Sequence, residues 1–525
     1  MNHLATSTSE TDVLIAGAGP TGLMLALWLT RLKVRVRIVD PKSGPTVETR
    51  AIVVQARTLE FYDQLGLGDE ARARGQHFDA FSLWVRSKEE ATVSFSDVAT
   101  DLTPHPRLNT LTQDQNEDLL VAALRVEGVE VEWGSQLTDF TQDGTGVTAR
   151  LEHGKEAQTA VETLNAHYLA GCDGGRSLVR HKLGLGFTGG TSSGTFFVAD
   201  TEARGTFRKN SLNVLLSRDA FFVLFPMKGA NRQRIVGIFP EDEAEAHGFE
   251  AVRPQIEASR VVSVEKVHWF SLYRVHHRVA EHFRRGRTFV LGDAGHVHSP
   301  LGGQGMNTGL GDAVNLAWKL AQALRYENEA LLDSYEAERM PFARALVAST
   351  DRAFGLISSP RASARALRTR ILPAVLGPFT YPRPIRLEIF LRLSQLRIRY
   401  PQSPLSEGQA GRVRGGERLP WVRLEDSSNF DTLKSLEWQL HVYGKAPISL
   451  ESWCRARALP LHVLPFTPAA RHAGLAKDAL YLVRPDGYIG LALPTFREEE
   501  LTRYVVRWVT SSGPPAVSEI PQFVS

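Results

Sequence analysis

A glycine-rich turn between two regular segments near the N-terminus constrains the fold most strongly. Residues 13–16 form a short apolar run, residues 17–22 have the pattern GxGxxG, and residues 23–32 are apolar at helical spacing. Residues 34–39 begin with alternating valine and arginine and end apolar, and Asp40 closes this run. The order strand, turn, helix, strand predicts a right-handed βαβ unit, and therefore a parallel α/β sheet whose faces are covered.

The glycines at 17, 19 and 22 suit a loop that binds phosphate. The first permits a tight turn, the second lets a pyrophosphate approach the backbone, and the third lets helix and strand pack closely. The helix N-terminus adds unpaired N–H donors and partial positive charge. Asp40 follows about twenty residues later, where a carboxylate accepts ribose hydroxyls and disfavours a 2′-phosphate, so NADP is not expected at this first site. A glycine turn in some other α/β protein is the alternative interpretation.

Size and charge limit the functions that the chain can have. With 525 residues and 43% hydrophobic composition, it can bury a large core and should divide into roughly three folding units. The 61 basic and 58 acidic residues leave a net charge of +3, so no general field attracts nucleic acid. Cys172 and Cys454 lie outside any CxxC pattern, which disfavours a disulfide framework and a cysteine-based metal site. We interpret both as buried small hydrophobes.

The apolar stretch at residues 13–30 superficially suggests a signal peptide or a membrane anchor. The preceding TSTSETD tract carries no positive charge, and the stretch begins with three glycines and a proline in its first half. Neither feature suits a secretory signal or a spanning helix. We therefore expect a soluble, cytoplasmic protein that does not bind membranes.

Periodicity and composition predict five parts, arranged as an α/β nucleotide-binding sheet, an inserted β-rich domain and a C-terminal domain. Residues 360–400 are rich in Arg and Leu at helical spacing, and a helix packed on its own protein is favoured there over membrane binding. We detect no internal repeat. The predicted parts are residues 1–185 (nucleotide-binding domain, first part, with a short excursion into the substrate domain near 80–106), 186–285 (β-rich, mostly antiparallel substrate domain), 286–400 (nucleotide-binding domain, second part, and helical segment), 401–418 (linker) and 419–525 (small α/β domain).

A second glycine-dense loop lies in residues 287–324, between a strand and a long helix predicted at residues 311–324. Asp293 can accept hydrogen bonds from a polyol, and residues 303–307 lead to a helix whose positive end can face a negatively charged ring. A reduced flavin is anionic at one edge and fits this arrangement.

The segment GDAGHVHSPLGGQGMNTGLGDAVNLAWKLA resembles the GD motif of the FAD-dependent aromatic hydroxylases, the class A flavoprotein monooxygenases that include p-hydroxybenzoate, phenol and polyketide hydroxylases. Four further segments resemble family motifs in the expected order: GAGPTGL at 17–23, RAIVVQARTLE at 50–60, LTQDQNEDLL at 111–120 and GCDGGRSLVR at 171–180. The resemblance covers about the first 350 residues. It implies an FAD-binding, Rossmann-like sheet.

The resemblance also implies which residues contact FAD. Without it, Arg50 could be a surface ion-pair partner, Gln113 a helix-capping residue and Asp173 the cap of the next helix. No catalytic acid or base is identified, although Arg50 and Pro300 are candidates on the flavin side. The implied contacts are Gly17, Ala18, Gly19, Pro20, Thr21, Gly22, Asp40, Arg50, Gln113, Asp173, Asp293, Pro300, Gly303, Gln304, Gly305, Met306 and Asn307.

Candidate walls of a substrate pocket come from the β-rich domain and could equally be plain core; they are Phe222, Phe225, Pro226 and Trp269. His296 and His298 lie two residues apart, but no third ligand is evident nearby, so a metal site is not expected. The C-terminal domain resembles the thioredoxin-like appendage of the phenol and polyketide hydroxylases at residues 481–490, without a CxxC motif. A structural role, or support of a homodimer, is therefore expected there.

As a member of this family, the chain would use NADPH or NADH as a transient reductant, since it contains one dinucleotide fingerprint only. It would transfer oxygen from O2 to an aromatic small molecule through a flavin C4a-hydroperoxide. A phenolic or polycyclic polyketide substrate is preferred. The alternatives are Baeyer–Villiger-type insertion, antibiotic inactivation, or a non-catalytic flavin-binding protein; a flavin halogenase is disfavoured because no WxWxIP stretch is present.

Overall fold

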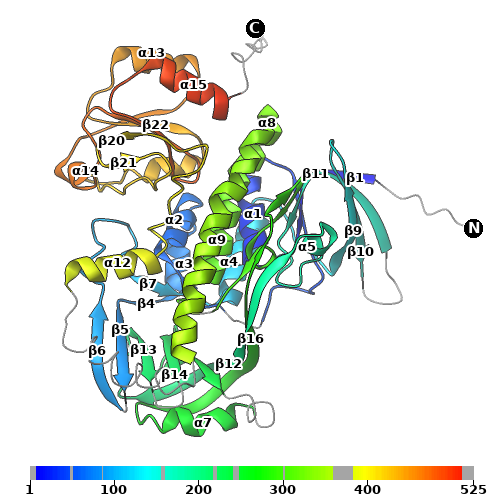
Figure 1. The fold of residues 1–525 in the computed structure, drawn as a ribbon, viewed down its shortest axis with the longest axis vertical. Coiled ribbons are helices and arrows are strands. Elements are labelled where there is room, and N and C mark those ends of the chain that lie inside the picture. The colour runs from blue at the N-terminus through cyan, green and yellow to red at the C-terminus, as the bar shows by residue number, and fades with distance from the viewer. Residues whose placement is uncertain are drawn as a thin grey trace, which may run out of the picture. The chain divides into compact units, whose positions relative to one another are not determined.

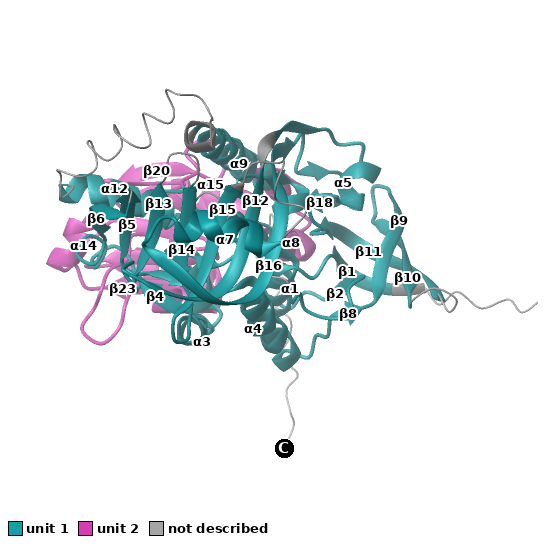
Figure 2. Cartoon of the chain, turned by 90° about the horizontal axis from the view of Figure 1, so that it is seen from below, with its two compact units in different colours: residues 1–318, 335–398 teal, residues 319–334, 399–525 magenta. Residues whose placement is uncertain are grey.

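The chain forms two compact units in a computed structural model. The first contains residues 1–318 and 335–398, and the second contains residues 319–334 and 399–525 (Figure 2). The expectation of three units was wrong because the strands of the inserted sheet alternate along the chain with those of the first sheet, so both belong to one unit. The structure describes residues 8–47, 51–85, 87–154, 160–216, 221–239, 248–299, 302–358 and 382–510.

The first sheet of unit 1 contains the predicted βαβ unit (Figure 1). Strand β1 (Thr8–Ala16) pairs in parallel with β2 (Val36–Asp40) on one side and with β11 (Ala160–Gly171) on the other, and α1 (Pro20–Arg31) connects β1 to β2. The buried run from Val13 to Ala16 is typical of a strand covered on both faces. The remaining strands are β8 (Glu132–Trp133), β9 (Ser135–Gln142), β10 (Val147–His153), β17 (Arg284–Arg285) and β18 (Thr288–Val290).

The second sheet of unit 1 has eight strands in the order β19-β16-β12-β15-β14-β13-β5-β6. Helix α7 (Phe249–Glu257) packs on one face, and side chains of the other face cluster with Ile52 and Val53. The strands are β5 (Ala80–Val85), β6 (Lys88–Ser94), β12 (Phe187–Gly205), β13 (Ser211–Leu216), β14 (Phe221–Pro226), β15 (Arg232–Phe239), β16 (Val262–Ala280) and β19 (His296–Val297).

A small third sheet, β3-β7-β4, also belongs to unit 1; its strands are β3 (Val53–Val54), β4 (Gln76–Phe78) and β7 (Leu108–Thr110). The long helix after the second glycine loop begins at Gly305, six residues before its predicted start, and residues 360–381 of the predicted amphipathic segment lie outside the described residues. Among the described residues, no helix has the length and hydropathy needed to cross a membrane. The helices are α2 (Ala56–Gln64), α3 (Gly68–Arg74), α4 (Gln113–Val126), α5 (Leu178–Lys182), η2 (Gly292–Ala294), α8 (Gly305–Tyr326), α9 (Glu329–Ser358) and α12 (Arg383–Leu393).

Unit 2 is built on a sheet with the strand order β21-β20-β25-β24-β22-β23. The predicted linker at residues 401–418 was wrong, because this tract supplies β20 and β21. Its glycines make tight turns: a Cβ atom at Gly408, where φ is +75°, would lie 2.1 Å from the oxygen of Ala492. The elements are β20 (Glu407–Ala410), β21 (Val413–Arg414), η4 (Asp431–Ser435), β22 (Gln439–Tyr443), α13 (Ile448–Ala456), β23 (Leu461–Leu464), α14 (Pro468–His472), β24 (Leu480–Val483), β25 (Ile489–Leu493) and α15 (Glu498–Trp508).

Candidate functional site

The carboxyl ends of four parallel strands meet at one edge of the first sheet. Ala16 is in register with Val39 on β2 and with Gly171 on β11, and Gly171 is in register with Val290 on β18. Strand β1 lies between β2, which follows it in the chain, and β11, which comes much later, so the strand order reverses at β1. In open α/β sheets, ligands bind at the edge where the strand order reverses in this way.

The phosphate loop follows β1 at this edge, and its three glycines have different surroundings. At Gly17, with φ of +103°, a Cβ atom would lie 2.4 Å from the oxygen of Cys172. At Gly22 it would lie 2.0 Å from the oxygen of Gly17. At Gly19, which precedes α1, it would meet no atom within 4 Å. The tight turn and the close helix packing are thus confirmed, and the backbone at Gly19 is open to a ligand.

Asp40, at the end of β2, fixes the phosphate loop. Its carboxylate is buried and accepts hydrogen bonds from the N–H of Ala18 at 2.7 Å and from the N–H of Lys42 at 2.9 Å. A carboxylate has about four acceptor positions, so these two bonds leave room for ribose hydroxyls, beside Nζ of Lys42 at 3.9 Å from Oδ2. The predicted ribose contact stays a prediction.

Glu117 is a buried carboxylate that the sequence motifs did not single out. It accepts from the side-chain amide of Gln113 at 2.9 Å and from the N–H of Thr46 at 2.8 Å. Gln113 is the first residue of α4, and its side-chain nitrogen donates to Glu117, one turn further along the same helix. The spacing of four residues between these two polar side chains was the available signal, because such residues share a helix face.

The segment after β11 joins the first sheet to the second glycine loop. Asp173 accepts from the N–H of Val179 in the first turn of α5 at 3.1 Å, whereas the N-cap residue of this helix is Ser177, whose hydroxyl accepts from the N–H of Arg180. Burial raises the pKa of Asp173, and its Oδ1 has no hydrogen-bond partner among the described residues. Arg180, which the motifs did not assign, donates to the oxygens of Ala294 and Gly175, both at 2.9 Å.

Asp293 lies exposed in the turn after β18, and Thr21 packs tightly behind this turn. Cβ atoms at Gly292 and Gly309 would lie 2.6 and 2.3 Å from Oγ1 of Thr21. The first turn of α1 therefore touches both the turn and α8, and larger residues at these two glycines would separate them. This arrangement gives Asp293 a fixed place at the same edge as the phosphate loop.

A buried charge cluster supports the Asp293 turn from within. Asp312 on α8 accepts from the N–H of Gly292 at 3.1 Å, from Nε2 of His296 at 2.7 Å and from Nε of Arg339 at 2.6 Å. Burial acts to raise the pKa of Asp312, but the charges of Arg339 and His296 lower it overall. His296 therefore bonds to a carboxylate. No role was assigned from the sequence to Asp312, which lies inside the GD segment, or to Arg339, 27 residues further along the chain.

The loop before α8 is held against β3. Asn307 accepts from the N–H of Gln55 at 2.8 Å and donates to the oxygens of Val53 and Gly303 at 2.8 and 2.9 Å. At Gly303, with φ of +62°, a Cβ atom would lie 2.8 Å from that of Val53. Gln304 donates to the oxygen of Leu393. The side chains of Asn307 and Gln304 therefore hold the loop, whereas Gly303, Gly305 and Met306 remain partly exposed; Arg50 and Pro300 lie outside the described residues.

The two faces of β14 separate the predicted pocket residues. Phe225 clusters with Ile52 and Val53, the residues beside the loop before α8, whereas Phe222 packs on the face covered by α7. Phe222 therefore takes the core role that was the alternative for it, whereas Phe221 clusters with Phe225 on the other face. The oxygen of Pro226 accepts from Oγ1 of Thr110 at 2.7 Å.

Arg234 on β15 links this wall to the segment before β3. It is fully buried, bonds Asp200 through Nε and Nη2 at 2.6 and 2.8 Å, and donates from Nη1 to the oxygen of Ala51 at 3.1 Å. Its guanidinium carbon lies 5.8 Å from the ring centre of Trp269, which is partly exposed. A buried charge pair at this place fixes the distance between this sheet and the segment before β3.

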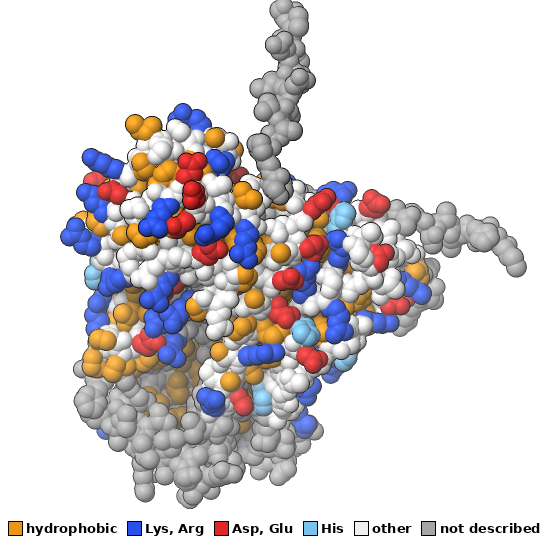
Figure 3. Space-filling view, turned by 45° about the horizontal axis from the view of Figure 1, so that its top comes forward, with side chains coloured by type: hydrophobic (Ala, Val, Ile, Leu, Met, Phe, Trp, Pro, Cys, Tyr) orange, Lys and Arg blue, Asp and Glu red, His pale blue; other side chains and the backbone are white. Residues whose placement is uncertain are grey.

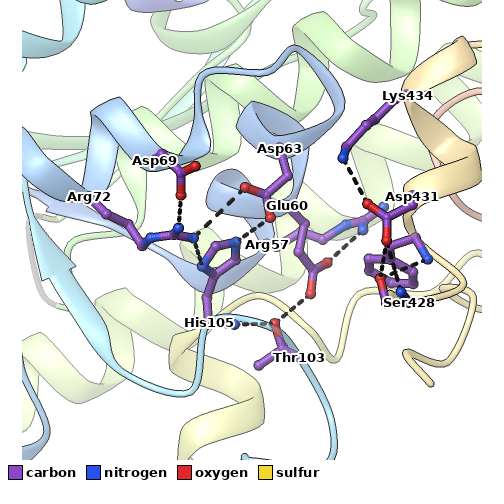
Figure 4. A network of polar contacts seen from close by, with 11 residues as sticks. Arg57, Glu60, Asp63, Asp69, Arg72, Thr103, His105, Ser428, Asp431 and Lys434 are labelled. Atoms are coloured by element: carbon purple, nitrogen blue, oxygen red, sulfur yellow. Dashed lines mark hydrogen bonds and ion pairs between the residues drawn. The ribbon is translucent and has the colours of Figure 1, made fainter. Parts of the chain in front are cut away.

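A second polar network joins α2 to the loop before β7 (Figure 4). Glu60 bonds Arg57 at 2.8 Å and Thr103 at 2.7 Å, and Nε2 of His105 lies 2.6 Å from Asp63. Most of the polar atoms shown bond to one another, so we assign the network a supporting role.

Two further features bear on metal ions and nucleic acid. Glu132, His153 and Glu162 lie close enough to bind a metal, but Arg37 forms ion pairs with both carboxylates at 2.7 and 2.6 Å. The guanidinium of Arg37 thus pairs with both carboxylates, as expected of an ion-pair cluster. On the face drawn in Figure 3, basic and acidic side chains are interspersed with apolar ones.

Comparisons with known proteins extend over nearly the whole chain. The FAD binding domain family matches residues 10–350. The 6-methylpretetramide 4-monooxygenase of Streptomyces rimosus is 37% identical over 520 residues, covering 91% of this chain and 90% of that protein. The structure of the anhydrotetracycline hydroxylase OxyS from Streptomyces rimosus has a TM-score of 0.75 at 29% identity, covering 97% of this chain and 100% of that chain. A ternary complex of aklavinone-11 hydroxylase with FAD and aklavinone has a TM-score of 0.75 at 26% identity, covering 95% and 99%.

Proposed function

The chain belongs to the FAD binding domain family and is an FAD-dependent monooxygenase, and from this premise we propose that it hydroxylates a phenolic ring of a polycyclic polyketide. NADPH or NADH is the proposed reductant and O2 the oxidant. The observation that supports the proposal best is the position of one apolar wall. Phe221, Val223 and Phe225 cluster with Ile52 and Val53, next to the glycine loop that precedes α8.

The residues at the sheet edge suit FAD in their chemistry. The open backbone at Gly19 and the N-terminus of α1 suit a pyrophosphate, and Asp40 retains acceptor positions for a ribose. Asp293 offers a carboxylate to the ribityl chain. The partly exposed backbone of Gly303 and Gly305, at the N-terminus of α8, suits the anionic edge of the ring.

When bound, FAD supplies the redox chemistry, taking electrons from the nicotinamide and passing them to O2. The protein's own contribution is positional. Arg234 and Asp200 satisfy each other, so the wall adds little free charge beside the substrate, and the aromatic and branched side chains exclude water. An apolar polycyclic ring can pack on such a wall, with a few polar contacts setting its orientation.

Relatives that match nearly the whole chain support the substrate class. The names of two of them specify 6-methylpretetramide and anhydrotetracycline, and a third was crystallised with aklavinone. The apolar wall of this chain extends over a second cluster in which Phe196 and Val275 pack with Tyr273. A surface of this extent favours a polycyclic substrate over a single ring.

We propose that unit 2 is a thioredoxin-like domain without redox activity. Strands β22 and β23 are parallel with α13 between them, and β24 and β25 follow as antiparallel neighbours before α15. This order and these directions support a thioredoxin-like sheet. Burial raises the pKa of Cys454 to about 11, which keeps its thiol unreactive, and support of a homodimer is the role we propose.

The function is tested with purified protein and a panel of phenols. We expect the denatured protein to release FAD, and we expect tetracyclic phenols to stimulate NAD(P)H oxidation more than monocyclic ones. Mass analysis under ¹⁸O2 should then show one labelled oxygen in the product. Equal stimulation by monocyclic phenols would contradict the substrate class. Absence of stimulation by any aromatic compound would favour a non-catalytic flavin-binding role.

A further inference from the structure

Only one of the two ring nitrogens of His298 has a hydrogen-bond partner among the described residues. Its Nδ1 lies 2.7 Å from the oxygen of Ser299, so Nδ1 carries the proton and donates it there. Nε2 is then a lone-pair acceptor. It is sealed from solvent and has no hydrogen-bond partner among the residues that the structure describes. A buried acceptor without a donor is unfavourable and calls for an explanation.

Two features keep this imidazole neutral and place it at the site. Burial, together with the nearby His296, lowers the pKa of His298 to about 4 although the hydrogen bond to Ser299 acts to raise it, so Nε2 stays an acceptor at neutral pH. A Cβ atom at Gly305, the first residue of α8, would lie 3.6 Å from Nε2. The positive end of a helix disfavours a protonated imidazole beside it.

The helix start offers donors next to this acceptor. The N–H of Thr308 bonds to the oxygen of Gln304 at 2.9 Å, so the N–H groups before Thr308 have no acceptor within the helix. The end of α8 therefore presents backbone donors on one side and an imidazole lone pair on the other. A ligand with both an acceptor and an O–H or N–H donor matches this pair.

We propose that Nε2 of His298 accepts a hydrogen bond from an O–H or N–H group of a reactant bound at the start of α8. The donor is either a phenolic hydroxyl of the substrate or a ring N–H of the flavin. The first possibility, a phenolic hydroxyl of the substrate, rests on the proposed function; the second, a ring N–H of the flavin, does not. His298 acts in this way as a positioning residue for the bound reactants, because a directed acceptor fixes the rotation of a ring that packs on an otherwise apolar wall.

A matched pair of variants separates the two nitrogens. In His298→Asn, the amide can still donate to the oxygen of Ser299, but nothing replaces Nε2. In His298→Gln, the longer amide reaches the place of Nε2 and offers an acceptor there. We expect thermal unfolding of both apoproteins to stay close to that of the wild type. We expect His298→Asn to lose about tenfold in affinity for the reactant that supplies the donor, and His298→Gln to retain most of it.

Two titrations identify the donor. FAD is titrated into each apoprotein by fluorescence quenching, and a tetracyclic phenol and its O-methyl ether are titrated into each holoprotein by flavin absorbance. A loss confined to FAD identifies the flavin N–H. A loss for the phenol, with none for the ether, identifies the phenolic hydroxyl.

Equal affinities of all three proteins for both ligands would overturn the proposal, since Nε2 would then be satisfied by water. The Nε2 resonance of ¹⁵N-labelled His298 gives an independent readout and should shift when the donor binds. If the wild type binds FAD but no phenol, the proposed substrate class fails while the FAD titration still decides whether the flavin supplies the donor.

Discussion

Replacing Gly19 or Gly22 of the phosphate loop by alanine should impair two different properties. We expect Gly22→Ala to lower stability and Gly19→Ala to weaken FAD binding. At Gly22, the new Cβ would lie 2.0 Å from the oxygen of Gly17, whereas real Cβ atoms stay at least 3.0 Å from such an atom. The end of β1 and the start of α1 must then separate by about 1 Å (3.0 − 2.0). At Gly19, the Cβ meets no protein atom within 4 Å.

The expected magnitudes follow from these surroundings. Overpacking costs about 1–3 kcal/mol, and a backbone oxygen cannot move aside as a side chain can, so Gly22→Ala should lower the free energy of unfolding by about 2 kcal/mol or more. Gly19 precedes α1, where alanine in place of glycine costs at most about 1 kcal/mol. Its methyl group would instead stand between the backbone and a pyrophosphate. We expect Gly19→Ala to weaken FAD binding at least about tenfold, which corresponds to about 1.4 kcal/mol.

Urea unfolding of the apoproteins measures stability, and quenching of FAD fluorescence measures affinity. Gly144→Ala is a matched control, because its Cβ also meets no atom within 4 Å but lies in the turn between β9 and β10. If Gly19→Ala binds FAD as tightly as Gly144→Ala, the loop does not approach the pyrophosphate and the assignment is wrong. If Gly22→Ala is as stable as the wild type, the close packing of α1 on β1 is not a constraint.

Three further outcomes follow from the structure. Arg234→Met leaves Asp200 buried without its partner, so we expect a loss of about 3–5 kcal/mol in urea unfolding, part of which Asp200→Asn should restore in the double variant. Gly305→Val should lower FAD occupancy or the flavin reduction potential, measured by dye equilibration, while thermal stability changes little, because the added Cβ makes only an ordinary contact with His298. Burial lowers the pKa of His441 from 6.5 to about 3, so the unfolded chain binds a proton first; stability should fall as the pH drops from about 6.5 towards 3, and His441→Asn should flatten this dependence in tryptophan-monitored unfolding.

The sequence determined those features that depend on a few neighbouring residues. The alternation and glycine spacing at residues 13–40 specify β1, α1 and β2, because a strand, a turn with positive φ and a helix are each set by local conformation. The motifs likewise identified the chemistry of the FAD-dependent family. The predicted linker was wrong because it rested on local composition alone. Gly408 and Gly411 indicate turns, but a turn does not reveal whether the residues beside it pair with a sheet.

Only the tertiary structure decided which distant residues meet. Asp312 bonds Gly292 and Arg339, and Arg234 reaches Ala51 across 183 residues, because the packing of whole elements brings them together. Strand β14 gives a second example of what the sequence alone does not determine. Both Phe222 and Phe225 are apolar, but neighbouring strand residues point to opposite faces, so the register of β14 in its sheet determines which residue faces the site. Register depends on the pairing with β13 and β15, which no local pattern in the sequence contains.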